Sequence, residues 1–375
     1  MNDRENPGQD NLRLDNLRSL DSFLSSQNLP SVVVLGTSAT DTIYEGAFGV
    51  LKSDSNESIN IDTPHAIMSM TKPITSLAIM QLVEQGKIEL DAPAIDFIPA
   101  YKEIKVLNHV DLANRRFDTT DLNHDFTVRE LLTHTAGFGY SFCNETLFAF
   151  GPEGESAMFP LSHQPGERWT YGISTRLLGE IVAAVNGADL EKSLTDLVFT
   201  PLGMSNTSYE VKDDQVYPHS LKDGKWIPGE KFPKMPFGDG GLISTARDYA
   251  KLLRCFLQNG EPLLEAQHFR AMTSNQIGDL FITEQPAANP GLTYPFPTGG
   301  GVDKFGLGFQ LHVQPETGMR SAGSYSWCGV LNTFFWGDPV RKVGGIVLMQ
   351  VLPLYEPVCL ETLSGFEKRF YQLIG

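Results

Sequence analysis

The pattern of apolar and polar positions predicts strands near both ends of the chain and helices between them. Residues 31–38 and 42–50 are two apolar segments joined by a short polar turn, which favours a pair of neighbouring strands. The longest apolar helical pattern of the first third begins near residue 67 and stops at Gly86, a residue suited to end a helix. Three more strands are expected near the end of the chain, at residues 324–330, 332–338 and 343–351, before a closing amphipathic helix.

This order of elements predicts an α/β (α+β) fold, in which one sheet is built from both termini and a helical part is inserted between them. A helix at about residues 11–27 should precede the first strand. Residues 1–90 and 236–375 are expected to form a discontinuous α/β domain. Residues 91–235 are expected to form a mostly helical inserted domain, in which Thr127 and Glu130 begin one helix as a capping box.

Composition narrows the class of protein. Apolar residues make up 41% of the chain and charged residues 20%, as in ordinary globular proteins. The net charge of −16 argues against nucleic-acid partners and anionic membranes, which attract basic surfaces. The polar N-terminal segment lacks the apolar stretch of an export signal, and the four cysteines are widely spread. We therefore expect reduced thiols and a cytoplasmic location, and we expect no metal or other cofactor because no typical metal-ligand spacing occurs.

Candidate chemistry begins where the first long helix starts. Ser69 and Lys72 are three residues apart, so a helix places them on one face, a single turn apart. A buried lysine loses its charge by desolvation, and a neutral lysine is a base that can activate a serine hydroxyl. The alternative is a capping serine beside a surface lysine, and the spacing alone does not decide between the two.

Other motifs add further candidates. No serine lies in a G-x-S-x-G context, and His134 and His163 are more simply explained by structural or solvated roles. Tyr171 precedes an expected helix start near Ser174 and could share proton transfer with a lysine. Near the C-terminus, a glycine inside an expected strand follows Trp327 and Cys328, and such glycines mark close approach of a ligand or of another backbone.

Taken in order, these motifs resemble the serine β-lactamase and penicillin-binding-protein superfamily. The resemblance covers about residues 30 to 355 and is carried by the motifs that contain Ser69, Lys72, Tyr171 and Trp327. It also rests on four phrases typical of the esterase-type members: FTVRELLTHTAGFGY, QPGERWTYGIST, VFTPLGMSNTSY and GDGGLISTARDYAKLL. The resemblance implies an antiparallel sheet flanked by helices, with Ser69, Lys72 and Tyr171 as catalytic residues.

The chain also departs from class C β-lactamases, and the departures favour esters. The Tyr-x-Asn motif is replaced by Tyr171-Gly172-Ile173-Ser174, where we expect Ser174 in the place of the asparagine. Trp327-Cys328-Gly329 replaces Lys-Thr-Gly, which removes the cation that would bind the carboxylate of a β-lactam, and it is similar to the W-x-G motif of family VIII carboxylesterases. By the same resemblance, Trp327 and Gly329 should line the substrate site, and the backbone N–H groups of Ser69 and Val330 should form the oxyanion hole.

The sequence therefore predicts a serine carboxylesterase that forms an acyl-enzyme on Ser69 and acts on esters of small to medium carboxylic acids. A β-lactamase or D-amino-acid peptidase on the same fold is the alternative, and a catalytically inactive binding protein is a further one. The expected partner is a small-molecule ester, and the oligomeric state stays open. An apolar substrate pocket, with core filling as an equal alternative, is suggested by a run of phenylalanines: Phe138, Phe142, Phe148 and Phe150.

Overall fold

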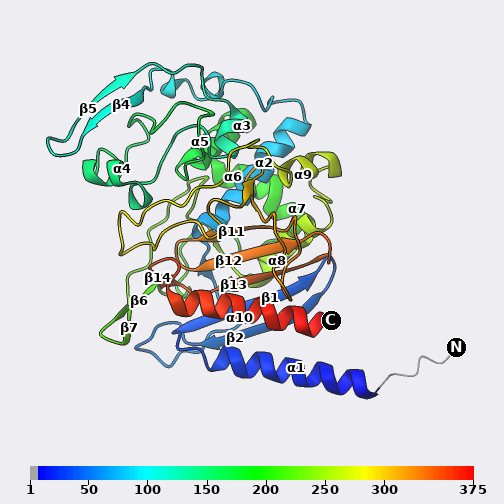
Figure 1. The fold of residues 1–375 in the computed structure, drawn as a ribbon. Helices are drawn as coiled ribbons and strands as arrows, with labels where there is room; N and C mark the ends of the chain where they lie inside the picture. The colour runs from blue at the N-terminus through cyan, green and yellow to red at the C-terminus, as the bar shows by residue number, and fades with distance from the viewer. Residues whose placement is uncertain (1–6) are drawn as a thin grey trace.

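Strands from the two ends of the chain meet in one sheet, as the sequence predicted (Figure 1). The computed structural model describes residues 7–375, and within them this sheet has seven strands in the order β2-β1-β13-β12-β11-β10-β9, each antiparallel to its neighbour. Its strands are β1 (Ser31–Ser38), β2 (Thr42–Gly49), β9 (Lys304–Phe305), β10 (Gln310–Leu311), β11 (Tyr325–Gly329), β12 (Thr333–Asp338) and β13 (Val343–Leu348). The N-terminal strand β1 lies between β2 and the C-terminal strand β13, so both ends of the chain build the sheet.

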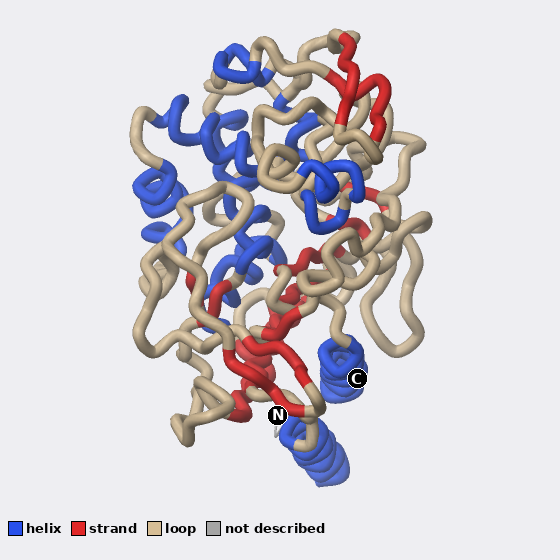
Figure 2. The backbone as a smooth tube through the Cα atoms, turned by 90° about the vertical axis from the view of Figure 1, so that its left-hand side faces the viewer, coloured by secondary structure: helices blue, strands red, loops and turns tan. Residues whose placement is uncertain are grey.

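Helices cover both faces of this sheet. The first and last helices, α1 (Pro7–Ser25) and α10 (Pro357–Ile374), lie side by side on one face (Figure 2). Helix α8 (Ala246–Leu257) packs against the other face. Phe366 of α10 packs on Trp336 of β12, and Phe256 of α8 packs on the neighbouring ring of Phe335. Because adjacent residues of a strand point to opposite faces, β12 contributes large aromatic rings to both layers of the core.

One glycine makes room for the largest of these rings. Gly345 is paired with Trp336 across β13 and β12, and a Cβ atom at Gly345 would lie 2.1 Å from the Trp336 ring. A side chain at this position would therefore displace the indole, since real Cβ atoms do not approach so closely. The other glycine of β13, Gly344, is also constrained by Trp336, because a Cβ atom there would lie 2.5 Å from the Trp336 backbone oxygen.

The middle of the chain is less helical than the sequence predicted. Its helices are α3 (Val128–Leu132), α4 (Glu145–Phe150), α5 (Ser174–Asn186), α6 (Leu190–Leu194) and α7 (Thr200–Leu202), and α9 (Ala266–Met272) follows α8. Two β-hairpins interrupt them: β4 (Val106–Asp111) with β5 (Arg116–Thr120), and β6 (His219–Lys222) with β7 (Lys225–Pro228). Short strands complete the fold: β3 (His65–Ala66) pairs with β8 (Ile243–Ser244), and β14 (Val351–Leu352) pairs with β6. Most residues of the β4–β5 hairpin are exposed, so its sequence lacks the apolar alternation that predicts a strand.

The helix that follows Ser69 is the buried centre of the molecule. Helix α2 (Lys72–Glu84) is buried on every side from Lys72 to Leu82, which explains its nearly continuous apolar sequence. The preceding residues Met68–Thr71 form a 3-10 turn rather than the first turn of the α-helix, so Ser69 lies just before α2. Gly86 follows the helix with φ of 68°, as expected for a helix-ending glycine.

Helix ends and membrane segments can also be compared with the sequence. The first helix spans Pro7–Ser25 instead of about 11–27, whereas α5 begins at Ser174, where the sequence predicted a helix start. In the described part of the chain, no helix is both long and apolar enough to cross a membrane.

The capping box at the start of α3 provides a stability prediction. The Thr127 side chain accepts a hydrogen bond from the Glu130 N–H, and the Glu130 carboxylate accepts one from the Thr127 N–H. Thr127→Ala should lower the free energy of unfolding by about 1 kcal/mol, because one N–H of the first turn loses its partner. Urea unfolding measures this change, and an unaltered midpoint would show that the cap contributes nothing to stability.

Candidate active site

The hydroxyl of Ser69 lies between an amine and a phenol. The Ser69 Oγ atom is 3.1 Å from Lys72 Nζ and 2.8 Å from the Tyr171 hydroxyl oxygen. Ser69 is half-buried, whereas Lys72 and Tyr171 are almost fully buried. The structure therefore brings together the three residues that the sequence proposed as catalytic.

The residue before Ser69 has an unusual backbone conformation. Met68 has φ of 47°, in the left-handed region that residues with a side chain rarely adopt. Such strain is common at functional sites, where the surrounding structure holds it in place. Here the strain lies at the point where the chain turns from β3 into the 3-10 turn that carries Ser69.

Lys72 is buried deeply enough to lose its charge near neutral pH. Burial lowers the pKa of Lys72 from 10.5 to about 7, although the charge of Asp239 acts in the opposite direction. A shift of this size corresponds to about 5 kcal/mol against the charged form. At neutral pH, Lys72 is therefore an uncharged amine in a substantial fraction of the molecules.

Tyr171 is a neutral phenol enclosed by aromatic rings. Its ring lies 4.8 Å from the ring of Phe296, 5.1 Å from His134 and 5.2 Å from Trp327, measured between ring centres. Burial raises the pKa of Tyr171 well above 10, so its hydroxyl keeps its proton and donates to Ser69 Oγ. This contrast in protonation favours Lys72 over Tyr171 as the base.

Sequence reasoning missed a second tyrosine that contacts Lys72. Lys72 Nζ lies 2.9 Å from the Tyr140 hydroxyl and 2.7 Å from the backbone oxygen of Asp239. The Tyr140 hydroxyl in turn donates to the Asp239 carboxylate, which also pairs with Arg176 at 3.2 Å. Tyr140, Asp239 and Arg176 thus form a polar network behind the amine, in which Asp239 is buried and the other two are half-buried.

Two glycines explain how this network assembles. A Cβ atom at Gly172 would lie 2.2 Å from the Phe138 backbone oxygen, and one at Gly238 would lie 2.4 Å from the Thr175 backbone oxygen. The loops that carry Tyr140 and Asp239 therefore press directly against the segment that follows Tyr171. Gly172 stands in the phrase TYGIST and Gly238 in the phrase GDGG, and these glycines were the available signal in the sequence. The sequence did not reveal that they allow Tyr140 and Asp239 to reach Lys72.

The expectation for Ser174 is wrong by one residue. The asparagine of Tyr-x-Asn stands two positions after the tyrosine, and that position is Ile173 in this chain. Ser174 is fully buried at the start of α5, and its hydroxyl has no hydrogen-bond partner among the described residues. Lys72 donates instead to the hydroxyl oxygen of Tyr140, more than thirty residues earlier in the chain than Ser174.

The strand β11 lies against the Ser69 turn, as the glycine in it suggested. A Cβ atom at Gly329 would lie 2.5 Å from the Ile67 backbone oxygen, so the strand and the turn are in direct backbone contact. Val330 packs in one small apolar cluster with Met68. Trp327 is buried, and its ring lies beside Tyr171 and stacks with His134. The N–H groups of Ser69 and Val330 are thereby placed in neighbouring segments.

The four phenylalanines do not line one common pocket. Phe138 is buried against Phe126, and Phe150 is buried in a separate cluster with Leu147 and Phe159. Phe148 is exposed on α4. Phe142 stacks on Tyr140 at 5.0 Å and is the member of the four nearest the amine network. A run of similar residues in a sequence does not reveal which way each side chain points, which is why the shared pocket was wrong.

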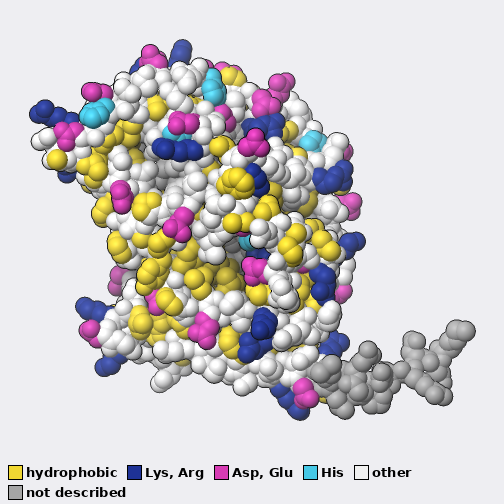
Figure 3. Space-filling view, viewed as in Figure 1, with side chains coloured by type: hydrophobic (Ala, Val, Ile, Leu, Met, Phe, Trp, Pro, Cys, Tyr) yellow, Lys and Arg dark blue, Asp and Glu magenta, His cyan; other side chains and the backbone are white. Residues whose placement is uncertain are grey.

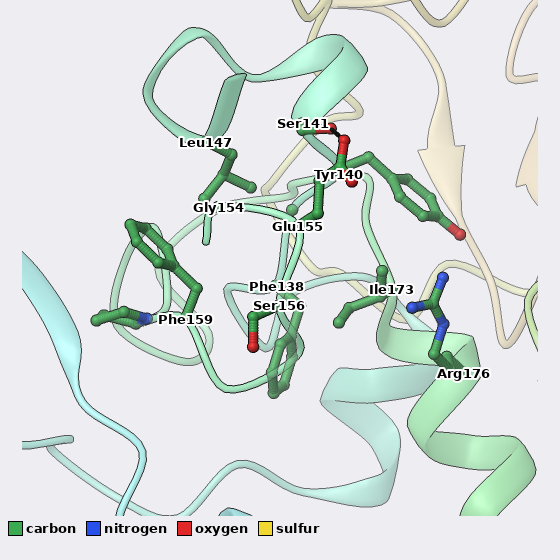
Figure 4. A pocket seen from close by; sticks show the side chains of 12 residues that line it. Phe138, Tyr140, Ser141, Leu147, Gly154, Glu155, Ser156, Phe159, Ile173 and Arg176 are labelled. Atoms are coloured by element: carbon green, nitrogen blue, oxygen red, sulfur yellow. Dashed lines mark hydrogen bonds between the residues drawn. The ribbon is translucent and has the colours of Figure 1, made fainter. Parts of the chain in front are cut away.

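A cavity of about 200 Å³ is lined in part by Tyr140, whose hydroxyl contacts Lys72 (Figure 4). Phe138, Leu147 and Phe159 supply apolar walls, and Ser141 donates a hydrogen bond to Glu155 at its edge. Arg176 and Ile173, from α5 and the segment before it, complete the lining near the Tyr140 ring. The cavity therefore borders the polar network behind the amine, because Tyr140 and Arg176 belong to both.

The two histidines considered from sequence serve other purposes. The His134 ring is buried beside the rings of Tyr171 and Trp327. Its Nδ1 atom has no hydrogen-bond partner within the described part of the chain, so the ring packs among aromatic side chains. His163 is buried rather than solvated and bonds to the Thr170 hydroxyl at 2.9 Å.

Among the residues that the structure describes, one group of side chains could hold a metal ion, but it is distant from Ser69. Glu84, Glu265 and His268 bring their ligand atoms within 4.8 Å of one another. Glu84 ends α2, whereas Lys72 begins it, so the two are separated by about 18 Å along the helix. This group therefore has no part in the chemistry at Ser69.

The chain is similar to several known enzymes. The sequence profile of the family described as Beta-lactamase matches residues 16–364. The monacolin J acid methylbutanoyltransferase of Aspergillus terreus is 25% identical over 93% of both chains. The lovastatin esterase of Penicillium rubens is 25% identical over 88% of this chain and 91% of its own. The structure of simvastatin synthase from Aspergillus terreus superposes with a TM-score of 0.83 at 21% identity, over 96% of this chain and 98% of that one.

The contact between Tyr140 and Lys72 can be tested by removing one oxygen atom. Tyr140→Phe should lower kcat for an ester substrate about 10- to 100-fold, because the amine loses the partner that orients it. Tyr294→Phe, at an exposed tyrosine, is the matched control and should leave kcat unchanged. Equal turnover in the two variants would show that Tyr140 does not support the amine.

Proposed function

Because this chain belongs to the Beta-lactamase family, we propose that it is a serine ester hydrolase that forms an acyl-enzyme on Ser69. The observation that carries the proposal is the position of the Ser69 hydroxyl, within hydrogen-bond distance of both the Lys72 amine and the Tyr171 phenol. A nucleophile, a base and an acid at one point are what acyl transfer requires. The proposed substrates are esters of small to medium, uncharged carboxylic acids.

The hydrogen bonds around Lys72 leave its lone pair for Ser69. A neutral amine has two N–H donors and one lone pair. The Asp239 backbone oxygen can only accept, and the Tyr140 oxygen accepts because its own proton goes to the Asp239 carboxylate. Both N–H groups are thus occupied, and the lone pair is left to accept the Ser69 proton.

Acylation then follows from this arrangement of protons. As the Ser69 oxygen attacks the ester carbonyl carbon, its proton passes to Lys72. The bond between the carbonyl carbon and the alcohol oxygen breaks, and the alcohol leaves with a proton supplied through Tyr171 and Lys72. Water releases the acid in the same way, with the same pair accepting its proton.

The negative charge on the carbonyl oxygen needs donors during both steps. The N–H groups of Ser69 and Val330 are proposed for this role, since their segments are in contact through Gly329 and Met68. Two backbone donors at this point would stabilise the oxyanion more than the carbonyl of the bound ester. This difference is what accelerates the reaction.

Esters are favoured over β-lactams and D-amino-acid peptides because a tryptophan stands where β-lactamases carry a lysine. Trp327 is buried beside Tyr171, and it offers no charge to a substrate carboxylate. A buried aromatic side chain instead favours an apolar group next to the reacting carbonyl. Burial keeps the phenol of Tyr171 protonated.

Acyl transfer to an alcohol is the second candidate function. The Aspergillus terreus relative is named as a methylbutanoyltransferase, and the Penicillium rubens relative is named as an esterase. The two reactions share the acyl-enzyme and differ in whether water or an alcohol accepts the acyl group. The residues around Ser69 are suited to either acceptor.

Removing the base or the acid tests the proposal directly. Lys72→Ala and Tyr171→Phe should each lower kcat for a p-nitrophenyl ester by about 10²- to 10⁴-fold. Lys72→Met keeps the apolar stem and serves as a packing control that should be equally inactive. Thermal unfolding checks that each variant is folded, and a folded variant with unchanged kcat would remove that residue from the mechanism.

The lowered pKa of Lys72 predicts how the rate depends on pH. The base works only when uncharged, so kcat/KM should rise with pH through an inflection near pH 7 and then level off. Tyr171 keeps its proton to well above pH 10, so it causes no decrease between pH 8 and 10. Initial rates from pH 5 to 9.5 measure this profile, and an inflection above pH 9 would contradict a desolvated Lys72.

A further inference from the structure

A second, larger cavity lies under the C-terminal helix. It has a volume of about 590 Å³ and is enclosed by residues of β10, β11, β12 and α10. Its lining includes apolar side chains of Phe334, Tyr355 and Leu363, and it contains neither Ser69 nor Lys72. Figure 3 shows a hollow bordered by apolar side chains in the region where Figure 1 places these elements. The volume is sufficient for a small organic molecule.

A serine, a histidine and an aspartate form a relay in this cavity. The Ser326 Oγ atom lies 2.8 Å from His312 Nε2, and His312 Nδ1 lies 3.1 Å from Asp303 Oδ2. All three residues line the cavity. Ser326 belongs to β11, His312 follows β10 and Asp303 precedes β9, so the edge of the sheet brings them together.

The aspartate holds the imidazole in the form that a base requires. Asp303 accepts hydrogen bonds from Gln310 Nε2 at 2.7 Å and from the Val313 N–H at 3.3 Å. Although burial opposes it, hydrogen bonds from His312 and Gln310 keep the pKa of Asp303 below its usual value. Burial and the charge of Arg320 lower the pKa of His312, which is therefore neutral. With Nδ1–H donating to Asp303, the Nε2 lone pair faces the Ser326 hydroxyl.

Arg320 supplies an N–H donor beside the His312 base. Its Nη1 atom lies 3.0 Å from His312 Nε2, while its Nε and Nη2 atoms pair with the Glu367 carboxylate. In the free protein Nη1 and the Ser326 hydroxyl share the lone pair of Nε2. Once Nε2 takes up the serine proton, the Nη1 donor becomes available to the carbonyl oxygen of the ester, which turns negative when Ser326 bonds to its carbon.

We propose that Ser326 is a second reactive serine, with His312 as its base, Asp303 as the group that orients the base and Arg320 as the donor to the oxyanion. The Ser326 oxygen forms a bond to the carbonyl carbon of an ester while its proton passes to His312. The bond to the alcohol oxygen breaks, and His312 returns the proton to the leaving alcohol. The acyl group stays on Ser326 as an ester. The three groups and their contacts match the arrangement of a serine, its base and an orienting carboxylate.

The cavity selects uncharged substrates with an apolar group. Aromatic and aliphatic side chains form part of its wall, and the side chains of Glu316 and Glu361 in its lining would repel an anion. Arg320 is neutralised by Glu367, so it offers no net attraction to a carboxylate. Esters with a small aromatic or branched apolar group are the class that fits.

A fluorophosphonate probe tests this site separately from Ser69. In a Ser69→Ala variant the probe should still attach, with loss of fluoride, and peptide mass spectrometry should place the adduct on Ser326. The rate of attachment should fall at least tenfold in Ser69→Ala/His312→Gln. Should that variant lose its thermal unfolding transition, Ser69→Ala/Asp303→Asn provides the same comparison. Labelling of Ser69 in the unmodified protein is a separate result and concerns only the proposed function.

Two other serines are internal controls. Ser364 lines the same cavity, but its hydroxyl bonds to the backbone oxygen of Glu361 and no base contacts it in the described chain. Ser324 is buried close by, and its hydroxyl has no partner among the described residues. Labelling of Ser326 at ten times the rate of Ser364 or more supports the proposal. No adduct on Ser326, equal labelling of Ser364, or a rate unaffected by the loss of His312 would overturn it.

Discussion

The burial of the Lys72 amine beside Ser69 sets the conditions for the rest of the site. An exposed lysine would be charged at neutral pH and could only donate hydrogen bonds to the serine. Because the amine is enclosed by α2, the Tyr140 loop and the Asp239 loop, its pKa is lowered to about 7 and it can accept a proton. The serine, the phenol and the acidic network behind the amine are useful only in combination with this desolvation.

The fold provides this burial by joining parts of the chain that are far apart in sequence. Helix α2 is enclosed on all sides, and its first residue is Lys72. The strand β11, from the other end of the chain, touches the Ser69 turn so closely that only glycine fits at position 329. Keeping the amine charged in this environment would cost about 5 kcal/mol. The packing of the surrounding core must offset this loss of stability.

The sequence was sufficient for features that depend on local patterns. The bounds of β1 and the order of the C-terminal strands follow from apolar segments, and the contact between Ser69 and Lys72 follows from helical spacing. The position of Tyr171 followed from a resemblance between motifs and not from spacing. Its contact with Ser69 crosses 102 positions, a separation that periodicity does not address.

Other features depended on contacts that no local pattern encodes. Tyr140 and Asp239 meet Lys72 through loops whose approach is set by glycines at 172 and 238. The phenylalanines around α4 are the same residue type but point into different surroundings. The relay of Ser326, His312 and Asp303 requires the pairing of β9, β10 and β11 at one side of the sheet. These are tertiary effects, so they became visible only in the folded chain.

The central claim is that the Ser69 oxygen carries the acyl group during turnover. The most direct measurement is to mix the protein with an excess of a p-nitrophenyl ester, quench it in acid within a turnover and locate the added mass by peptide mass spectrometry. The account predicts one acyl group on the peptide that contains Ser69, in the unmodified protein and not in Ser69→Ala. Turnover of the ester with no acyl group on that peptide, or unchanged turnover by Ser69→Ala, would contradict it.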